Sequence, residues 1–381
     1  MEPVLTVGGL LLSLPGLVIW FIILLLPWRP WSTRESLDTD GKPGKTDLSS
    51  ISVLIPARNE ESVISETLDA LVSQGQGLHI YLIDDQSSDR TADIVRSKQL
   101  PGVEIIHGET LPEGWSGKLW ALEQGRKRTA TDLILLLDAD IKLAPGILTK
   151  VLDKFNGEKL DLLSLMAFLR METFWEKLLM PAFIFFFKLL YPFGLSNSTS
   201  RYVAAAAGGF ILIKKNILED SGGFESLRHC LIDDCSLARN VKNSGGRTWT
   251  GLTHSAISLR EYHNLQSIWD MVARTAFTQL GYSWLLLAVC TILMTISFVF
   301  PLLIIFSGNI LLCICGLLTL GIMYFCYLPT LSYYKIHPLW AIPLPVTGVI
   351  YLCMTWSSAW RHWFKAGANW KNRSYTSSAH K

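Results

Sequence analysis

The sequence predicts an α/β domain with a mostly parallel sheet, joined to apolar helices at both of its ends. Short apolar runs alternate with amphipathic helical segments between residues 51 and 150, as in a parallel sheet with crossover helices. Acidic residues follow directly after two of these runs. Half of the 381 residues are hydrophobic and the mean hydropathy is +0.31, which is high for a soluble enzyme and indicates membrane segments.

The first segment is an apolar run at residues 4–26, long enough to span a bilayer and interrupted only by Pro15. It has neither a basic region before it nor a small-residue cleavage site after it, so residues 1–28 are expected to be an uncleaved transmembrane anchor. Basic residues follow the run, whereas Glu2 alone precedes it. The positive-inside rule therefore predicts that the following domain is cytoplasmic. The polar residues 29–50 are expected to be a linker.

Residues 51–150 contain four expected strands, at 51–55, 79–83, 103–106 and 133–137, with helices between them. Ligands of open α/β sheets bind beyond the carboxyl ends of such strands. Asp138 and Asp140 stand there, directly after the fourth strand. Side chains at i and i+2 of an extended chain point the same way, so both carboxylates could reach one hard cation that also needs phosphate oxygens. A turn or a helix cap is the alternative for this pair.

Residues 151–265 form the second part of the domain. A strand is expected at 161–165, and Gly208 and Gly209 lead into another strand that ends at 213. Small residues let the backbone approach a ligand closely, although a plain tight turn explains them nearly as well. Asp233 and Asp234 precede a helix. They either cap this helix or form a pair in which burial and a neighbouring charge raise one pKa.

The remaining apolar segments suggest contact with a membrane. Residues 175–195 are apolar but contain Lys177, Pro181 and Lys188, so they are expected to lie on the bilayer. Residues 266–283 are expected to form an interfacial helix. Residues 284–366 contain three segments of spanning length, at 284–306, 310–328 and 339–360, before a basic tail at 367–381. Three crossings would place this tail outside, against the positive-inside rule, so the number of crossings stays open.

Charge and cysteine content exclude other classes. A net charge of +2 argues against nucleic-acid binding through bulk electrostatics. The seven cysteines show no metal-binding spacing, which argues against a zinc site and a disulfide framework.

Four segments resemble, in order and spacing, the nucleotide-sugar half of a family 2 glycosyltransferase with the GT-A fold: IPARNE at 55–60, IDDQSSD at 83–89, GKLWA at 117–121 and DAD at 138–140. The resemblance covers roughly residues 50–260. It implies a nucleotide-sugar half at 51–150 and an acceptor half at 151–265. The variant GWSGK at 114–118, together with the flanking apolar segments, is similar to the hopanoid-biosynthesis-associated glycosyltransferases. Ceramide-glucosyltransferase-like enzymes share this pattern.

The resemblance implies a UDP- or GDP-sugar donor and a Mg²⁺ or Mn²⁺ ion. Carboxylates suit the donor because ribose hydroxyls and base N–H groups need acceptors. Lys118 would meet the diphosphate as a point charge, and the metal held by Asp140 and Asp138 would act as a Lewis acid. Arg274 would clasp the diphosphate or else lie at the membrane surface. The implied donor-binding residues are Pro56, Arg58, Glu60, Asp84, Asp85, Lys118, Asp138 and Arg274.

The acceptor side is implied by the same resemblance. Asp234 takes the place of the family's catalytic base, with Asp233 where the family has Glu. A base is needed because an alcohol must lose its proton as it attacks. The implied acceptor-binding residues are Gly208, Gly209 and Trp269. The Gln-x-x-Arg-Trp motif of processive synthases is missing at its spacing after the acidic pair, which favours transfer of a single sugar.

The expected function is therefore inverting, metal-dependent transfer of one sugar to a lipid hydroxyl, in hopanoid or other glycolipid synthesis, at the cytoplasmic face of the cell membrane. Two alternatives remain, a processive polysaccharide synthase and a non-catalytic membrane scaffold with a decayed fold. The intact set of acidic residues argues against decay. The sequence does not specify the sugar, the nucleotide base, the lipid or the oligomeric state.

Overall fold

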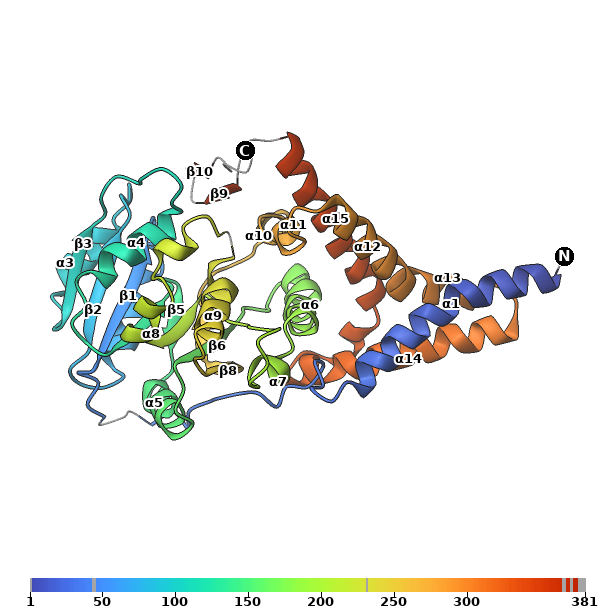
Figure 1. Ribbon diagram of the computed structural model, residues 1–381, viewed down its shortest axis with the longest axis horizontal. Helices are drawn as coiled ribbons and strands as arrows, with labels where there is room; N and C mark the ends of the chain where they lie inside the picture. Colours follow the sequence, from blue (N-terminus) through green and yellow to red (C-terminus); the bar gives the residue numbers. More distant parts are fainter. Residues whose placement is uncertain (1, 43–45, 231, 365–367, 371–372, 376–381) are drawn as a thin grey trace. The chain divides into compact units, whose positions relative to one another are not determined.

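The computed structural model describes residues 2–42, 46–230, 232–364, 368–370 and 373–375. The chain divides into two compact units. The α/β unit comprises Glu35–Arg170, Phe193–Glu261 and Asn369–Lys381, and the helical unit comprises Met1–Arg34, Met171–Pro192 and Tyr262–Ala368. Figure 1 traces both along the chain.

The α/β unit is built on an eight-stranded sheet with the order β3-β2-β1-β4-β7-β6-β8-β5. The first four strands in this order are parallel neighbours, and β8 is parallel to β6. β7 runs antiparallel to β4 and β6, and β5 runs antiparallel to β8. The strands are β1 (Ile51–Ala57), β2 (His79–Asp84), β3 (Val103–His107), β4 (Leu133–Leu137), β5 (Ile141–Leu143), β6 (Leu162–Phe168), β7 (Phe210–Lys214) and β8 (Thr248–Ser258).

The sheet is therefore mixed, whereas a mostly parallel sheet was predicted. The prediction is right for the half that holds β1 to β4 and wrong for β7 and β5. β7 begins at Phe210, opposite Leu137 at the end of β4. The chain thus re-enters the sheet at the edge where β6 has ended, so β7 has to run antiparallel.

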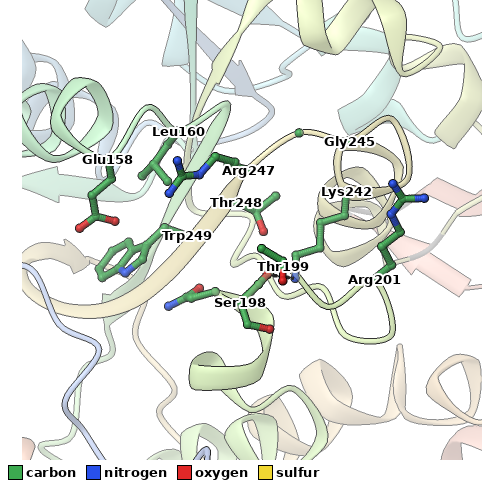
Figure 2. Close-up of a pocket in the computed structure, with 12 residues that line it drawn as sticks. Glu158, Leu160, Ser198, Thr199, Arg201, Lys242, Gly245, Arg247, Thr248 and Trp249 are labelled. Carbon is green, nitrogen blue, oxygen red and sulfur yellow. Dashed lines mark hydrogen bonds between the residues drawn. The ribbon is translucent and has the colours of Figure 1, made fainter.

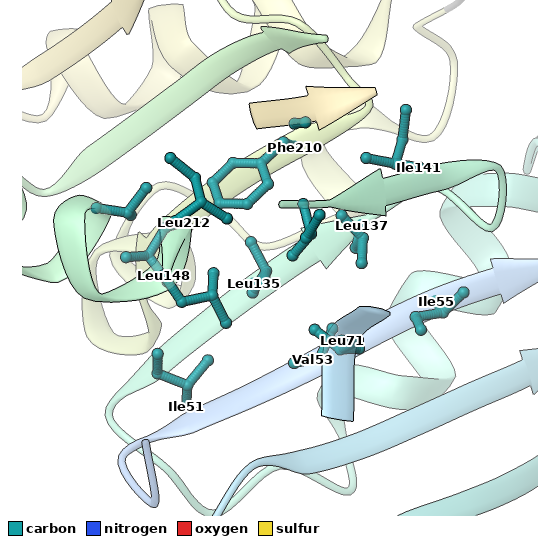
Figure 3. Packing of buried hydrophobic residues seen from close by; sticks show 14 of the residues in the cluster. Ile51, Val53, Ile55, Leu71, Leu135, Leu137, Ile141, Leu148, Phe210 and Leu212 are labelled. Carbon is teal, nitrogen blue, oxygen red and sulfur yellow. The ribbon is translucent and has the colours of Figure 1, made fainter. Parts of the chain in front are cut away.

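Helices cover both faces of this sheet and make an α/β/α sandwich. One face packs on α2 (Ile64–Val72), α3 (Thr91–Lys98) and α5 (Ile147–Gly157), and Figure 3 shows part of this core. The other face packs on α4 (Gly117–Arg126), α8 (Lys215–Asp220) and α9 (Asp233–Asn243). Val53 and Ile55 belong to the first core and Leu54 to the second. Burial on both faces explains why the strands read as unbroken apolar runs.

Part of the expected linker packs against the α/β unit. The Leu37 N–H donates to the Leu252 carbonyl at 3.0 Å, and the Leu252 N–H donates to the Glu35 carbonyl at 2.8 Å. The carboxylate of Asp38 lies 2.9 Å from Nδ1 of His254. β5 pairs with β8 only from Ala256 to Ser258, so the backbone groups around Leu252 need other partners, and residues 35–38 supply them.

The helical unit contains α1 (Glu2–Leu25), α6 (Phe174–Leu190), α10 (Leu265–Ala273), α11 (Ala276–Gln279), α12 (Trp284–Met294), α13 (Phe300–Ile305), α14 (Ile310–Tyr333) and α15 (Leu344–Phe364). The Trp20 side chain is 1% exposed, and its indole N–H donates to the Ser297 carbonyl at 3.1 Å. Phe185 of α6 stacks on Trp20 and also contacts Tyr327. These apolar contacts explain why residues 171–192 group with the helical unit and not with the acceptor half, where residues 175–195 were expected.

Among the described residues, two helices are long and apolar enough to cross a membrane, Trp284–Ile305 and Ile310–Tyr333. They coincide with the expected segments at 284–306 and 310–328. The third expected segment falls on α15, which is not one of these two helices, and α1 covers the expected anchor. α10 and α11 cover the expected interfacial helix. Most of the expected basic tail lies outside the described residues.

The other short elements are α7 (Phe193–Ser196), the 3-10 helices Glu225–Leu227 and Pro338–Ala341, the π-helix Thr295–Val299, and a two-stranded sheet of β9 (Ala368–Trp370) and β10 (Arg373–Tyr375).

Candidate active site

The sequence motifs gather at the carboxyl ends of β2, β1 and β4, which are adjacent parallel strands. Ala57, in the first motif and at the end of β1, pairs with Asp84 at the end of β2. Pro56 lies inside β1 and is buried. Pairing of β1 with β4 ends at Leu54, two residues before Pro56. The missing N–H of Pro56 therefore breaks no hydrogen bond to β4. We call the set of Asp84, Asp85, Lys118, Asp138, Asp140, Asp233 and Asp234 the acidic edge.

Asp84 and Asp85 have different surroundings. Asp85 is 2% exposed, its N–H donates to the Ala57 carbonyl at 2.8 Å, and Nη1 of Arg58 lies 3.8 Å from its Oδ2. Arg58 also donates to the Asp85 carbonyl at 2.5 Å. Asp84 accepts the Ser87 N–H at 3.1 Å and so closes the loop after β2. Asp84 therefore has a structural role in this turn, whereas donor binding was expected from the resemblance.

Lys118 lies in the first turn of α4, whose start is fixed by Ser116 through a bond from the Leu119 N–H at 3.3 Å. Its Nζ is 2.6 Å from Oδ1 of Asp138 and donates to the Gly208 carbonyl at 3.3 Å. Burial opposes the charge, but nearby carboxylates outweigh burial and raise the pKa of Lys118. Lys118 is therefore a fixed positive charge.

Asp138 and Asp140 follow β4 in a tight turn. The Asp138 N–H donates to the Gly209 carbonyl at 3.1 Å, which ties this turn to the start of β7. Burial raises the pKa of Asp140 to about 6, and repulsion from Asp138 and Glu60 adds to this, whereas Arg260 opposes it. Nε of Arg260 lies 4.0 Å from Oδ2 of Asp140. The two carboxylates repel each other, which is the electrostatic environment that a divalent cation relieves.

The donor set for a metal is small. In the part of the chain that the structure describes, no group of three or more His, Cys, Asp or Glu side chains could hold an ion. Mg²⁺ in nucleotide sites is commonly bound by one or two carboxylates together with substrate phosphates and water. Asp138 and Asp140 fit that type of site and do not fit a metal site made by protein ligands alone.

Asp234 begins α9 and faces Gly208. The Gly208 N–H donates to Oδ2 of Asp234 at 2.9 Å, and the Cys235 N–H donates to its Oδ1 at 2.7 Å. Burial raises the pKa of Asp234 to about 6 and repulsion from Asp233 adds to this, while the two N–H groups and Lys118 oppose it. A Cβ on Gly208 would lie 3.3 Å from Nζ of Lys118 and 3.4 Å from Oδ2 of Asp234. Only a residue without a side chain leaves this space open.

These contacts join the donor side to the base side. Asp138 contacts Lys118, Lys118 contacts Gly208, and Gly208 contacts Asp234. Segments separated by about a hundred residues thus meet at one place. Gly209 lies beside them, because a Cβ there would be 4.0 Å from Oδ2 of Asp138.

One residue at this place and one beside the loop before α4 were not predicted. Arg260 follows β8 and reaches Asp140, and His229 lies against Gly114, where a Cβ would be 2.9 Å from Cε1 of the His229 ring. Both stand in segments without a motif. A basic residue directly after a strand was the only available signal for Arg260.

Trp269 and Arg274 belong to the helical unit. Trp269 lies in α10 and Arg274 directly follows it, exposed to solvent. Their expected roles in acceptor and donor binding remain predictions.

The comparisons with known proteins agree with this geometry. Residues 52–222 match the family model described as glycosyl transferase family 2. The chain is 34% identical over 120 residues to a 4,4'-diaponeurosporenoate glycosyltransferase of Staphylococcus haemolyticus, covering 32% of each chain. It is 29% identical over 254 residues to the probable glycosyltransferase YdaM of Bacillus subtilis, covering 60% of this chain and 59% of the relative. The chain thus spans between about a third and three fifths of these curated relatives.

A solved structure shows the same fold. The mannosyltransferase PcManGT of Pyrobaculum calidifontis, in complex with GDP-Man and Mn²⁺, superimposes with a TM-score of 0.54 at 16% identity, over 95% of this chain and 97% of that one. The relatives named here differ from the hopanoid-associated and ceramide enzymes that the motifs resemble, so that finer assignment stays a prediction. Residues 52–222, which are less than half of the chain, are similar to family 2 glycosyltransferases.

Proposed function

We propose that the protein transfers a single sugar from a nucleotide-sugar donor to a hydroxyl of a lipid-like acceptor, with inversion. The observation that carries this proposal is the connected set of Asp138, Lys118, Gly208 and Asp234. It places a fixed cation between a candidate metal ligand and a candidate base. This is what the transfer needs, because negative charge accumulates on the leaving group while the acceptor loses a proton.

The donor side would work through charge and acceptors. Asp85, held by Arg58, would accept from the ribose or the base, with Pro56, Glu60 and Asp84 around it. Lys118 would attract the diphosphate. Asp140 and Asp138 would hold Mg²⁺ or Mn²⁺, which supplies Lewis-acid stabilisation of the departing nucleoside diphosphate. The solved complex of the Pyrobaculum calidifontis mannosyltransferase with GDP-Man and Mn²⁺ supports this choice of ligands.

The acceptor side would use Asp234 as the base. With a pKa of about 6, its carboxylate is ionised at neutral pH and is more basic than an ordinary aspartate. The Gly208 N–H fixes one of its oxygens, and Asp233 raises its basicity. Gly208 and Gly209 would line the acceptor path. The roles expected for Trp269 in acceptor binding and for Arg274 at the diphosphate rest on the sequence resemblance alone. A single base without a second nucleophile fits direct displacement and hence inversion.

A lipid-like acceptor and a cell-membrane location have separate support. Trp284–Ile305 and Ile310–Tyr333 have the length and composition of membrane spans. Large apolar side chains on them are exposed, among them Leu285, Ile292, Leu311 and Leu318. Two relatives are named for 4,4'-diaponeurosporenoate, an acceptor of lipid-like character. A multi-pass protein with a cytoplasmic catalytic unit, acting on a hopanoid or a similar lipid, agrees with these features.

The test is transfer by the full chain in detergent or bilayers, with a panel of UDP- and GDP-sugars, Mn²⁺ and a lipid extract. Release of nucleoside diphosphate and mass spectrometry of the lipids would be measured together. We expect one hexose per acceptor. Polymer would indicate a processive synthase, and failure of UDP and GDP with Mn²⁺ to bind in calorimetry would indicate a scaffold.

A further inference from the structure

A polar pocket lies in the α/β unit, away from the acidic edge. It has a volume of about 540 Å³ and includes Leu160 and Thr248, which stand at the amino ends of β6 and β8. β6 is parallel to β8 and antiparallel to β7, which is in turn antiparallel to β4, so β6 runs in the same direction as β4. The acidic edge follows the carboxyl end of β4. The pocket is therefore at the opposite end of the sheet.

The charges that line this pocket are mostly positive. Three cations line it, Arg201, Lys242 and Arg247, against one carboxylate, Glu158. Oε1 of Glu158 is 2.6 Å from Nζ of Lys154, so this negative charge is already paired. Lys154 also lies 4.3 Å above the ring of Trp249, another lining residue. Figure 2 shows Arg201 beside Lys242 and Arg247 on the other side of the pocket. The surplus of positive charge favours an anionic ligand.

Lys242 is a buried residue of the pocket wall, and its ammonium group is held by backbone carbonyls. The residue is 4% exposed, and its ammonium donates to the carbonyls of Ser198, Ser200 and Val203 at 3.2, 2.8 and 2.8 Å. Burial lowers the pKa of Lys242 to about 8, so it is still charged at neutral pH. All three N–H groups of the ammonium thus donate to backbone carbonyls, and these hydrogen bonds fix the loop that carries Arg201.

Arg201 and Arg247 are exposed to solvent, unlike the buried Lys242. Within the described part of the chain neither guanidinium has a hydrogen-bonding or ion-pairing partner. Guanidinium groups match phosphate oxygens in geometry and often bind them with two parallel hydrogen bonds. Ligand pockets commonly measure about 300–1,000 Å³, so there is room here for a phosphate group and what is attached to it.

We propose that this pocket binds a phosphate-bearing ligand through Arg201 and Arg247, over the positive charge of Lys242. The phosphate belongs either to the headgroup of an anionic phospholipid or to a soluble phosphorylated compound. This site is separate from the donor site, because the residues proposed for the donor lie at the other end of the sheet.

The pocket and the acidic edge share two elements. α9 begins with Asp233 and Asp234 and carries Lys242 in its last turn. The loop around Lys242 continues through Ala205, whose carbonyl accepts from the Thr250 hydroxyl at 2.5 Å, to Gly208 beside Asp234. A ligand that orders this loop thus stabilises segments that also hold the candidate base.

The experiment measures thermal unfolding of the full chain in detergent, with EDTA and at constant ionic strength, while inorganic phosphate replaces chloride. We expect a saturable rise in Tm for the wild type. In the double variant Arg201→Gln/Arg247→Gln the apparent affinity for phosphate should fall at least about tenfold. A tenfold change in affinity corresponds to about 1.4 kcal/mol, and loss of one charge-assisted hydrogen bond costs more than this. The matched control, Arg96→Gln/Arg128→Gln, removes two exposed arginines of the same unit outside the pocket and should keep the wild-type response.

A second arm titrates dihexanoyl-phosphatidylglycerol against dihexanoyl-phosphatidylcholine below their micellar concentrations. Saturation by phosphatidylglycerol alone identifies a headgroup site, and saturation by inorganic phosphate identifies a site for soluble compounds. Asp234→Asn should keep the response, which separates this site from the proposed transferase activity. The proposal is overturned when neither probe gives a saturable shift, or when the pocket variant responds like the wild type. Single Arg201→Gln and Arg247→Gln variants serve the same test should the double variant not fold.

Discussion

Replacement of Asp234 by Asn is the sharpest test of the candidate base. Asn keeps the shape and one acceptor oxygen but cannot take a proton. General-base catalysis commonly contributes about 10²- to 10⁴-fold, so kcat should fall by that factor, or about 3–5 kcal/mol in the barrier. The fold should be retained, and the structure shows why.

Two effects of the substitution on stability oppose each other. The pKa of Asp234 is raised from 3.8 to about 6, so the ionised carboxylate is less favourable in the folded than in the unfolded state. This destabilisation is complete above pH 6 and is lost as the pH falls toward 4. About two pKa units correspond to at most about 3 kcal/mol at neutral pH, which Asn relieves. Asn also loses one charge-assisted bond, from the Gly208 or the Cys235 N–H, worth about 1.5–3 kcal/mol. The net change in the free energy of unfolding should therefore stay within about 1.5 kcal/mol.

The assay couples nucleoside diphosphate release to mass spectrometry of the glycosylated lipid, with Tm measured on the same samples. Asp93→Asn is the matched control, because Asp93 is 73% exposed on α3 and pairs only with Arg96 among the described contacts. The reasoning is refuted if Asp234→Asn keeps more than a tenth of the wild-type kcat with an unchanged Tm. A large fall in Tm would instead mean that the carboxylate is structural.

Four further predictions concern the same residues. The kcat/KM should decrease about tenfold per pH unit below about pH 6, because Asp234 must be ionised to act as a base; rates between pH 4.5 and 8 check this. Lys118→Gln should raise the donor KM at least about tenfold and should move the fall of kcat/KM at acidic pH to higher pH, because the cation lowers the pKa of Asp234. An unchanged pH profile would contradict an interaction between Lys118 and Asp234. Gly208→Ala should lower kcat, because its Cβ would lie 3.3 Å from Nζ of Lys118, whereas Gly157→Ala, with nothing within 4 Å, should leave kcat unchanged. EDTA should abolish transfer and Mn²⁺ restore it, and Asp140→Asn should need more Mn²⁺ for half-maximal rate; activity in EDTA equal to that in Mn²⁺ would remove the metal from the proposal.

Local sequence was enough to predict most elements of the α/β unit. The strands at 51–55 and 133–137 are buried on both faces, so each is a nearly continuous apolar run in the sequence. Polar residues at their ends then predicted which edge carries the site. The order of these motifs predicted the enzyme class, and residues 52–222 match the model of glycosyl transferase family 2.

Other features depend on contacts between distant segments. The antiparallel direction of β7 follows from where the chain re-enters the sheet, which no local pattern encodes. Residues 35–38 looked like a linker because they are polar, yet they pair with β8 because its edge is otherwise open. The segment at 175–195 has an apolar composition that fits a bilayer surface and a protein interior alike, and Phe185 packs against Trp20 in the helical unit.

The sequence by itself thus determined the parallel half of the sheet and the identity of the acidic residues, because periodicity and motif order are properties of neighbouring positions. Only the tertiary structure decided that Lys118 lies between Asp138 and Gly208, that Arg260 reaches Asp140, and that Lys242 closes a pocket at the far end of the sheet. Electrostatic partners are set by distance in space, and chain folding brings together charges whose separation along the sequence carries no information about that distance.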